Sequence, residues 1–590
     1  MKLFIPFLII LSFIAISPSF KMGLYGDDWI AIWRSIYALD PNHLGQWGYL
    51  AHFLTAYGSF NLIMGFITKL FGFTDVYFYI ISYIFRIIGA LSFYPLIFYI
   101  TKSKYASVFA VLFFSVTAIG LEATSWVFNM PVYLAVATFN IFLLFFIRSR
   151  EEENSKLFII SIAFFILTTF IASVRITGVP AFVLLSEAFW IITVGFQAPT
   201  IKKVLFRITG FLFSFIFLIF ISNFVGFIGK YQDRLLGHVN TWDSFFSSGI
   251  KISSEMIAAG RIDFLFYPII TLGGMVLPIL DVLNPTLGGV SFFEKVIVTF
   301  IVSLSIYMMF IILIFKYITN KKIWINWHIA GGVVWFFISV FVYYHSSKTL
   351  SFVNFLQLIT GGYFLLLGIL LSLKLKGDKR IINLMFISFA WLVLSFIIGW
   401  IRDPSVVLPT THRYFLISVT GLITFWSLII SLASKQSQKR IFLILSVFIF
   451  FNVIASRNYL NNLALNVHNA EVSNRIWSKF PYIQNMGKTP QPLLFLFTGE
   501  DARALYGSIT FGFPYHMALL YGIDDPSKMP IPVSEFAQVK SAVTDGKSLV
   551  QFELPAKAIP IENIYAFRLE GKDDLVNVTN DIRQQLRDAK

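Results

Sequence analysis

The chain has 590 residues, of which 57% are hydrophobic, 18% aromatic and only 13% charged, and its formal net charge is +15. So low a charged fraction excludes an ordinary soluble protein, which carries about 25% charged residues to cover its surface. Because there is no cysteine, disulfides, thiolate metal sites and cysteine nucleophiles are also excluded.

Apolar runs that match the thickness of a bilayer recur along the chain. About 20 residues cross the hydrocarbon core as a helix, and these runs are continuous rather than alternating, which favours helices over a barrel. We predict thirteen spans, at 3–20, 76–100, 105–120, 126–147, 157–174, 176–195, 208–227, 295–315, 323–345, 353–373, 381–400, 414–433 and 440–455. The first follows Lys2 and resembles a signal peptide, but Pro18 follows its one cleavage candidate, so we expect an uncleaved span.

The short connectors predict the orientation of these spans. With Lys2, the connectors that follow even-numbered spans hold 19 Lys and Arg residues, against 12 in the much longer loops on the opposite side. Positive charge is retained on the cytoplasmic side, so the N-terminus is predicted in the cytoplasm and the C-terminus outside the plasma membrane. The basic balance therefore reflects membrane orientation, and we expect no nucleic-acid partner.

The last part of the chain differs in composition from the rest. Residues 456–590 hold 14 Lys and Arg and 14 Asp and Glu, an amphipathic helix pattern at 467–480 and strand patterns at 493–497, 548–554 and 564–569. We predict an all-α polytopic membrane domain over 1–455 and a small extracytoplasmic α/β domain over 456–590.

Two adjacent acids, Asp27 and Asp28, follow the first span on the predicted outer side. Asp28 could be the N-cap of an interfacial helix over 29–39, because Asp accepts hydrogen bonds from free N–H groups there. That role does not explain Asp27. The pair is therefore also a candidate for a catalytic base.

Further charged residues lie in short connections on the same side. Glu122 precedes span four, and the basic residues are Arg175, Lys348, Arg402, His412 and Arg413. Basic residues on the outer side are unexpected, because positive charge is normally retained on the cytoplasmic side. One explanation is an anionic ligand such as a lipid phosphate, whose oxygens the planar guanidinium of arginine binds in pairs. The alternative is snorkelling, or pairing with Glu122 or Asp403. Within the spans, Arg86 and Glu187 are expected to have structural roles.

Four segments resemble the GT-C superfamily of membrane glycosyltransferases, including its O-mannosyltransferase and aminoarabinose-transferase branches. They are Asp27-Asp28, Phe66-Ile-Thr-Lys-Leu-Phe-Gly-Phe73, Glu122-Ala123-Thr124-Ser125-Trp126, which is similar to a Glu-Ala-x-x-Trp motif, and His412-Arg413-Tyr414-Phe415, which is similar to an Arg-Tyr element. The resemblance covers roughly residues 1–430. Ala118-Ile119-Gly120 stands where the O-mannosylating branch has His-Pro, and no tetratricopeptide array follows.

The resemblance implies inverting transfer of a sugar from a polyprenyl-phosphate carrier, at the outer face of the bilayer, to an unknown acceptor. Asp27 or Asp28 would be the base, and Glu122 would orient the acceptor or a metal. His412, Arg413 and Arg175 would hold the phosphate, with Lys348 and Arg402 as further candidates. In some members of the superfamily acids bind a divalent metal, so Asp27, Asp28 and Glu122 are also candidate ligands for Mg²⁺ or Mn²⁺.

Other function classes remain open from the sequence. A transporter or lipid flippase is one, although its charges are expected near the midplane and its halves often repeat, which this chain does not show. A polysaccharide polymerase or ligase is another; it would also depend on outer arginines but would not require the early acid pair.

Overall fold

The structure is a computed structural model that describes residues 4–38, 58–172, 178–228, 238–276, 322–346, 350–374, 378–402, 404–466, 469–499, 512–525, 528–544, 558–571 and 574–588. Within them, seven helices are long and apolar enough to cross a membrane. They coincide with the predicted spans at 3–20, 76–100, 126–147, 157–174, 323–345, 353–373 and 440–455. The total of thirteen stays a prediction, and the span at 295–315 lies outside the described residues.

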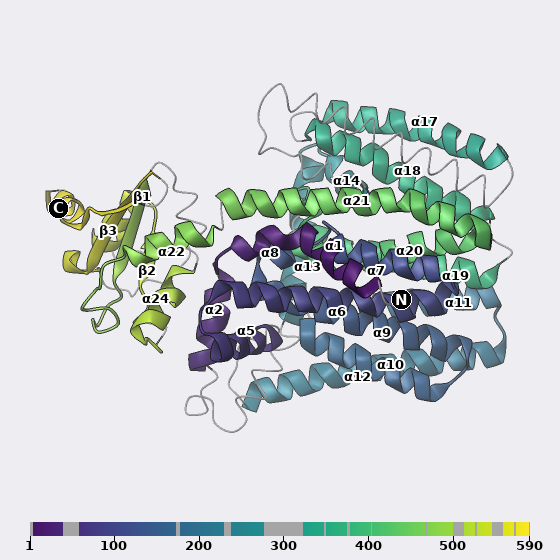
Figure 1. The fold of residues 1–590 in the computed structure, drawn as a ribbon, viewed down its shortest axis with the longest axis horizontal. Helices are drawn as coiled ribbons and strands as arrows, with labels where there is room; N and C mark the ends of the chain where they lie inside the picture. The colour runs from purple at the N-terminus through teal and green to yellow at the C-terminus, as the bar shows by residue number, and fades with distance from the viewer. Residues whose placement is uncertain are drawn as a thin grey trace.

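The helical part is a bundle whose long axes run roughly parallel (Figure 1). Its helices are α1 (Phe4–Ile16), η1 (Ser17–Lys21), α2 (Asp27–Trp33), η2 (Arg34–Ala38), α5 (Gly58–Phe71), α6 (Asp75–Thr101), α7 (Lys104–Val116), α8 (Glu122–Ser125), η3 (Val127–Asn129), α9 (Pro131–Glu151), α10 (Ser155–Ala172), α11 (Val179–Val194), α12 (Ala198–Ile228), α13 (His238–Ala258), η5 (Asp263–Phe266), α14 (Tyr267–Val276), α17 (Lys322–His345), α18 (Phe352–Lys374), α19 (Lys379–Arg402), η6 (Arg413–Phe415), α20 (Val419–Leu432) and α21 (Lys435–Asn466).

Helix α7 is shorter than the predicted span 105–120, for a reason that involves Arg86. The buried Arg86 guanidinium donates from Nε to the Ser115 carbonyl (2.9 Å) and from Nη2 to the Thr117 carbonyl (2.7 Å). The chain leaves the helix at Val116, and the last carbonyls are satisfied by this side chain rather than by a further turn. Arg86 therefore has the structural role expected of it. Glu187 has one too, as the buried partner of Arg207 (2.6 Å).

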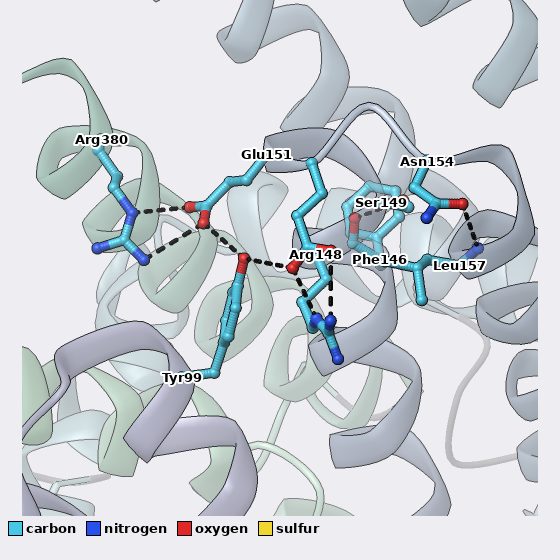
Figure 2. Close-up of polar contacts among 9 residues, drawn as sticks. Tyr99, Phe146, Arg148, Ser149, Glu151, Asn154, Leu157 and Arg380 are labelled. Carbon is cyan, nitrogen blue, oxygen red and sulfur yellow. Dashed lines mark hydrogen bonds and ion pairs between the residues drawn. The ribbon is translucent and has the colours of Figure 1, made fainter.

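One end of the bundle is held by an ion pair and a hydrogen bond between helices that are distant in sequence (Figure 2). Glu151 at the end of α9 accepts from Arg380 of α19 (2.9 Å) and from the Tyr99 hydroxyl of α6 (3.0 Å). Arg148 pairs with Glu152 on the next turn (2.8 Å). This is the end that carries the basic connectors.

The C-terminal residues form a mixed sheet beyond the other end of the bundle (Figure 1). Its elements are α22 (Ala470–Ser478), β1 (Leu494–Gly499), α24 (Phe513–Tyr521), β2 (Ile531–Val533), α25 (Phe536–Thr544), η9 (Ile561–Asn563), β3 (Ile564–Glu570), β4 (Asp574–Asn577) and α26 (Thr579–Asp588). The strand order is β2-β1-β3-β4. β1 runs parallel to β2 and β3, with Leu494 opposite both Ile531 and Ile564, and β4 is antiparallel to β3.

Alternation along β1 gives this sheet two apolar faces. Phe495 and Phe497 pack with Phe513 of α24, whereas Leu494 and Leu496 pack with Val539 of α25. The predicted strands at 493–497 and 564–569 correspond to β1 and β3, and the one at 548–554 lies outside the described residues. The short strands β2 and β4 were not predicted. Helix α21 continues through the predicted boundary at 455 as far as Asn466.

Candidate functional site

The acid pair lies in the first turn of α2, after a tight turn at Gly26, whose φ is +56°. Asp28 is fully buried, and its two oxygens accept from the backbone N–H groups of Phe128 (2.7 Å) and Tyr25 (3.0 Å). Burial raises the pKa of Asp28, and these two donors oppose the rise. The alternative role of Asp28 as an N-cap is wrong, because Gly26 holds that position, and Asp28 instead joins the turn before α2 to η3.

Asp27 has different surroundings from its neighbour. It is half-buried, and among the described residues no hydrogen bond to it is found. Burial raises its pKa, while the cationic Arg413 and Arg34 act in the opposite direction. Within the described part of the chain, Asp27 is therefore the acid of the pair whose oxygens accept no hydrogen bond, and two arginines lie close enough to affect its charge.

Glu122 and Arg413, 291 residues apart, form the second part of the site. Glu122 Oε2 accepts from the Arg413 backbone N–H (3.0 Å) and pairs with Arg413 Nη1 (2.9 Å), and His412 Nε2 lies 3.9 Å from the same oxygen. Burial would raise the pKa of Glu122, but Arg413 and His412 outweigh it, and the pKa is lowered. Glu122 is thus ionised and holds the arginine.

The backbone brings these two segments together. Gly120 N–H donates to the Thr410 carbonyl and Glu122 N–H to the Thr411 carbonyl, each at 2.9 Å. Gly120 has φ +67°, and a Cβ there would lie 2.6 Å from Leu416 Cα. Only glycine fits this crossing, because a side chain would meet both a strained backbone conformation and a clash.

Aromatic rings surround Arg413. Its guanidinium carbon lies 4.6 Å from the centre of the Trp126 ring, in cation–π geometry, and Trp126 stacks on Tyr25 at 5.2 Å. Ion pairing and stacking together restrict the rotamers of Arg413. The guanidinium has five N–H donors, so it can serve Glu122 and still bind another anion.

The structure thus brings together Asp27, Asp28, Glu122, His412 and Arg413. Arg175 and Lys348 lie outside the described residues. Arg402 ends α19, but its side chain is outside the described part of the chain. Sequence reasoning missed Arg34 as a site residue, although it follows Asp27 by seven positions, which places both on one face of a helix.

Two of the acids already have partners other than a metal. Each oxygen of Asp28 accepts from a backbone N–H group, and the charge of Glu122 is balanced by Arg413. In the parts of the chain that the structure describes, no group of three or more His, Asp or Glu side chains is arranged to hold a metal ion. The candidate Mg²⁺ or Mn²⁺ site at Asp27, Asp28 and Glu122 is therefore not supported by the geometry of the described residues.

The C-terminal residues pack directly on α2. The Trp29 ring stacks on His516 of α24, with ring centres 3.7 Å apart and planes 5° from parallel, and Trp33 Nε1 donates to the Ile523 carbonyl (2.8 Å). Gly512 allows this approach, since a Cβ there would lie 2.6 Å from Trp29 Cδ1. Burial lowers the pKa of His516 to about 3, so its ring is neutral. The sheet is therefore joined to the helix that carries Asp27.

Comparison with known proteins gives little beyond this geometry. No protein-family model and no curated protein matches the sequence. Among solved structures, the crystal structure of the Archaeoglobus fulgidus oligosaccharyltransferase in complex with Zn and sulfate aligns over 95% of this chain and 67% of that chain, with 14% identity and a TM-score of 0.33. A score this low does not establish a common fold, so the functional argument rests on the site itself.

Proposed function

We propose that this protein is an integral-membrane glycosyltransferase of the GT-C kind. It transfers a sugar from a polyprenyl-phosphate carrier to an acceptor at the outer face of the plasma membrane. The proposal is supported by one observation above the others. Asp27, whose carboxylate accepts no hydrogen bond from the described residues, lies near a pre-positioned arginine, Arg413, at one end of an apolar helical bundle.

Arg413 binds the phosphate of the carrier. Glu122 and Trp126 fix its position before the ligand arrives, so little conformational entropy is lost on binding. Arg34 and His412 add donors around it. As the bond to the sugar breaks, the phosphate gains negative charge, and fixed cations stabilise that charge in the transition state. Arg175, Lys348 and Arg402 remain candidates for further contacts to the carrier.

Asp27 is the general base. The acceptor oxygen forms a bond to the anomeric carbon from the face opposite the phosphate, the bond from that carbon to the phosphate oxygen breaks, and the hydroxyl proton passes to Asp27. Polyprenyl phosphate leaves, and the configuration inverts. A base works best with a pKa near the ambient pH, and burial moves the pKa of Asp27 in that direction.

Asp28 and Glu122 act through other groups. Asp28 holds the Tyr25 and Phe128 backbones that frame the first turn of α2, and Glu122 holds Arg413 rather than the acceptor or a metal. Both are positioning residues. The sheet that packs on α2 contributes to acceptor selection.

Asp27→Asn tests the assignment of the base. Loss of a general base costs about 10² to 10⁴ in rate, so we expect sugar transfer to fall by that factor with binding of the carrier retained. The assay is transfer from radiolabelled polyprenyl-phosphate sugars to envelope acceptors in proteoliposomes, supported by mass spectrometry of envelope glycans in a deletion strain carrying each variant. The control is Glu471→Gln, an exposed acid of α22, and it should keep full activity.

Each alternative has its own outcome in this assay. Full transfer by Asp27→Asn would show that the base is misassigned. If the unmodified protein transfers no sugar but moves the lipid across the bilayer, the transporter hypothesis replaces ours. Consumption of diphosphate-linked glycans alone would favour a polymerase or ligase.

A further inference from the structure

A cavity of about 400 Å³ lies at the end of the bundle that carries the basic connectors, far from the site above. It lies between the α9–α10 turn, with Glu153, Asn154 and Ser155, and the start of α12, with Pro199, Lys202 and Phe206. This volume is within the range of small-molecule sites, about 300–1,000 Å³. Positive-inside reasoning predicts this end to be cytoplasmic.

Cations predominate around the cavity. Lys203 pairs with Glu153, and Arg207 makes a two-pronged pair with Glu187 at 2.8 and 2.6 Å. Lys202 also lines the cavity, and it has no ion-pair partner within the described residues. The start of α12 adds the positive end of its helix dipole. The cavity therefore favours an anion.

A further positive charge, that of Arg150, lies behind the cavity. Arg150 is 3% exposed, and Glu187, Glu151 and Arg207 all lie close enough to affect its charge. Arg150 Nε, Ser186 Oγ and Asn383 Nδ2 have no hydrogen-bond partner in the described structure. Within the described residues Arg150 is bonded to the Ser186 carbonyl and the Asn383 amide rather than to a carboxylate, so an anion at the adjacent surface stabilises its charge.

Apolar side chains line the cavity and continue onto the surface beside it. Phe158 is buried, with its ring centre 5.8 Å from that of Phe206, whereas Phe206 and its neighbour Leu205 are each 56% exposed. On a helix that lines a bilayer, such side chains contact acyl chains. The exposed Lys202, beside the exposed Phe206 and Leu205, suits a molecule with an anionic head and a hydrocarbon tail.

We propose that this cavity binds the phosphate headgroup of an anionic phospholipid of the cytoplasmic leaflet, with Lys202 as its principal contact. Basic pockets between membrane helices on this side are suited to such headgroups, because anionic lipids concentrate there. The lipid joins α10 to α12 and offsets the positive charge of Arg150 and Arg207. The site is independent of sugar transfer.

Thermal unfolding of the full chain in detergent tests this proposal. The probes are dioctanoyl-phosphatidylglycerol, dioctanoyl-phosphatidylcholine and inorganic phosphate. We expect saturable stabilisation by the phosphatidylglycerol alone, about tenfold weaker in Lys202→Ala, since a hydrogen bond to a charged group is lost. Lys156→Ala removes a cation from the same end but outside the cavity, and should bind as the parent does. Glu153→Gln releases Lys203 and should bind several-fold more tightly.

Equal stabilisation by phosphatidylcholine would overturn the proposal, because the acyl chains alone would then account for binding. Equal stabilisation by inorganic phosphate would assign the cavity to a free anion and also overturn it. Unchanged affinity in Lys202→Ala, with the variant monodisperse and as stable as the parent without lipid, would exclude this cavity as the site.

Discussion

Glu122→Gln separates the role of Glu122 in holding Arg413 from a direct role in chemistry. Glutamine keeps the shape and can still accept from the Arg413 backbone N–H, but it removes the charge opposite Nη1 (2.9 Å). Hydrogen bonds to charged groups contribute about 1.5–3 kcal/mol. Because the two side chains remain 20% and 23% exposed, we expect a loss of about 1.5 kcal/mol, at the lower end of that range.

The contribution of Glu122 to stability should depend on pH in a direction that can be measured. The folded-state pKa of Glu122 is lowered, so its stabilising contribution is complete above the unfolded-state pKa, about 4.3, and disappears as the pH falls through the folded value. The difference between parent and Glu122→Gln should therefore be constant from pH 6 to 8 and shrink below about pH 4.

The assay is thermal unfolding in detergent across this range, with Glu471→Gln as the matched control. Glu471 pairs with Arg475 at 2.8 Å but is 77% exposed, and exposed pairs contribute about 0–1 kcal/mol. A drop of a few degrees is expected for Glu122→Gln and little change for the control. Equal midpoints for the two variants at pH 7 would refute the reasoning.

Two further predictions concern packing and protonation. Gly120→Ala should lower both thermal stability and sugar transfer, because its Cβ meets Leu416. The control is Gly72→Ala, which has nearly the same φ (+66°) but open space around the Cβ, and it should cost only about 1–2 kcal/mol of backbone strain. Between pH 6.5 and 3 the unfolded chain binds a proton at His516, whereas the buried ring, with its pKa of about 3, does not, so the stability of the parent falls as the pH falls. His516→Gln removes this contribution and should flatten the pH dependence of stability. Unfolding midpoints measure both, and an unchanged slope in His516→Gln would contradict a buried neutral ring.

Much of the helical architecture could be predicted from the sequence, because continuous apolar runs have one stable arrangement in lipid. The seven helices that are long enough to span coincide with predicted runs. Arg86 illustrates where this reasoning ends. It was expected to have a structural role, but its use of the Ser115 and Thr117 carbonyls, which ends α7 early, depends on a neighbouring helix.

The sequence alone picked out Asp27, Asp28, Glu122, His412 and Arg413, because charges beside apolar runs are conspicuous. Only the tertiary structure separated the two adjacent acids, leaving Asp27 half-buried near two arginines and Asp28 enclosed by backbone donors. It also selected Arg413, 291 residues away, as the partner of Glu122, a pairing that the sequence offered only as one alternative. The physical reason is that apolar periodicity is local and can be read along the chain, whereas burial and the partner of a charge depend on segments brought together by packing.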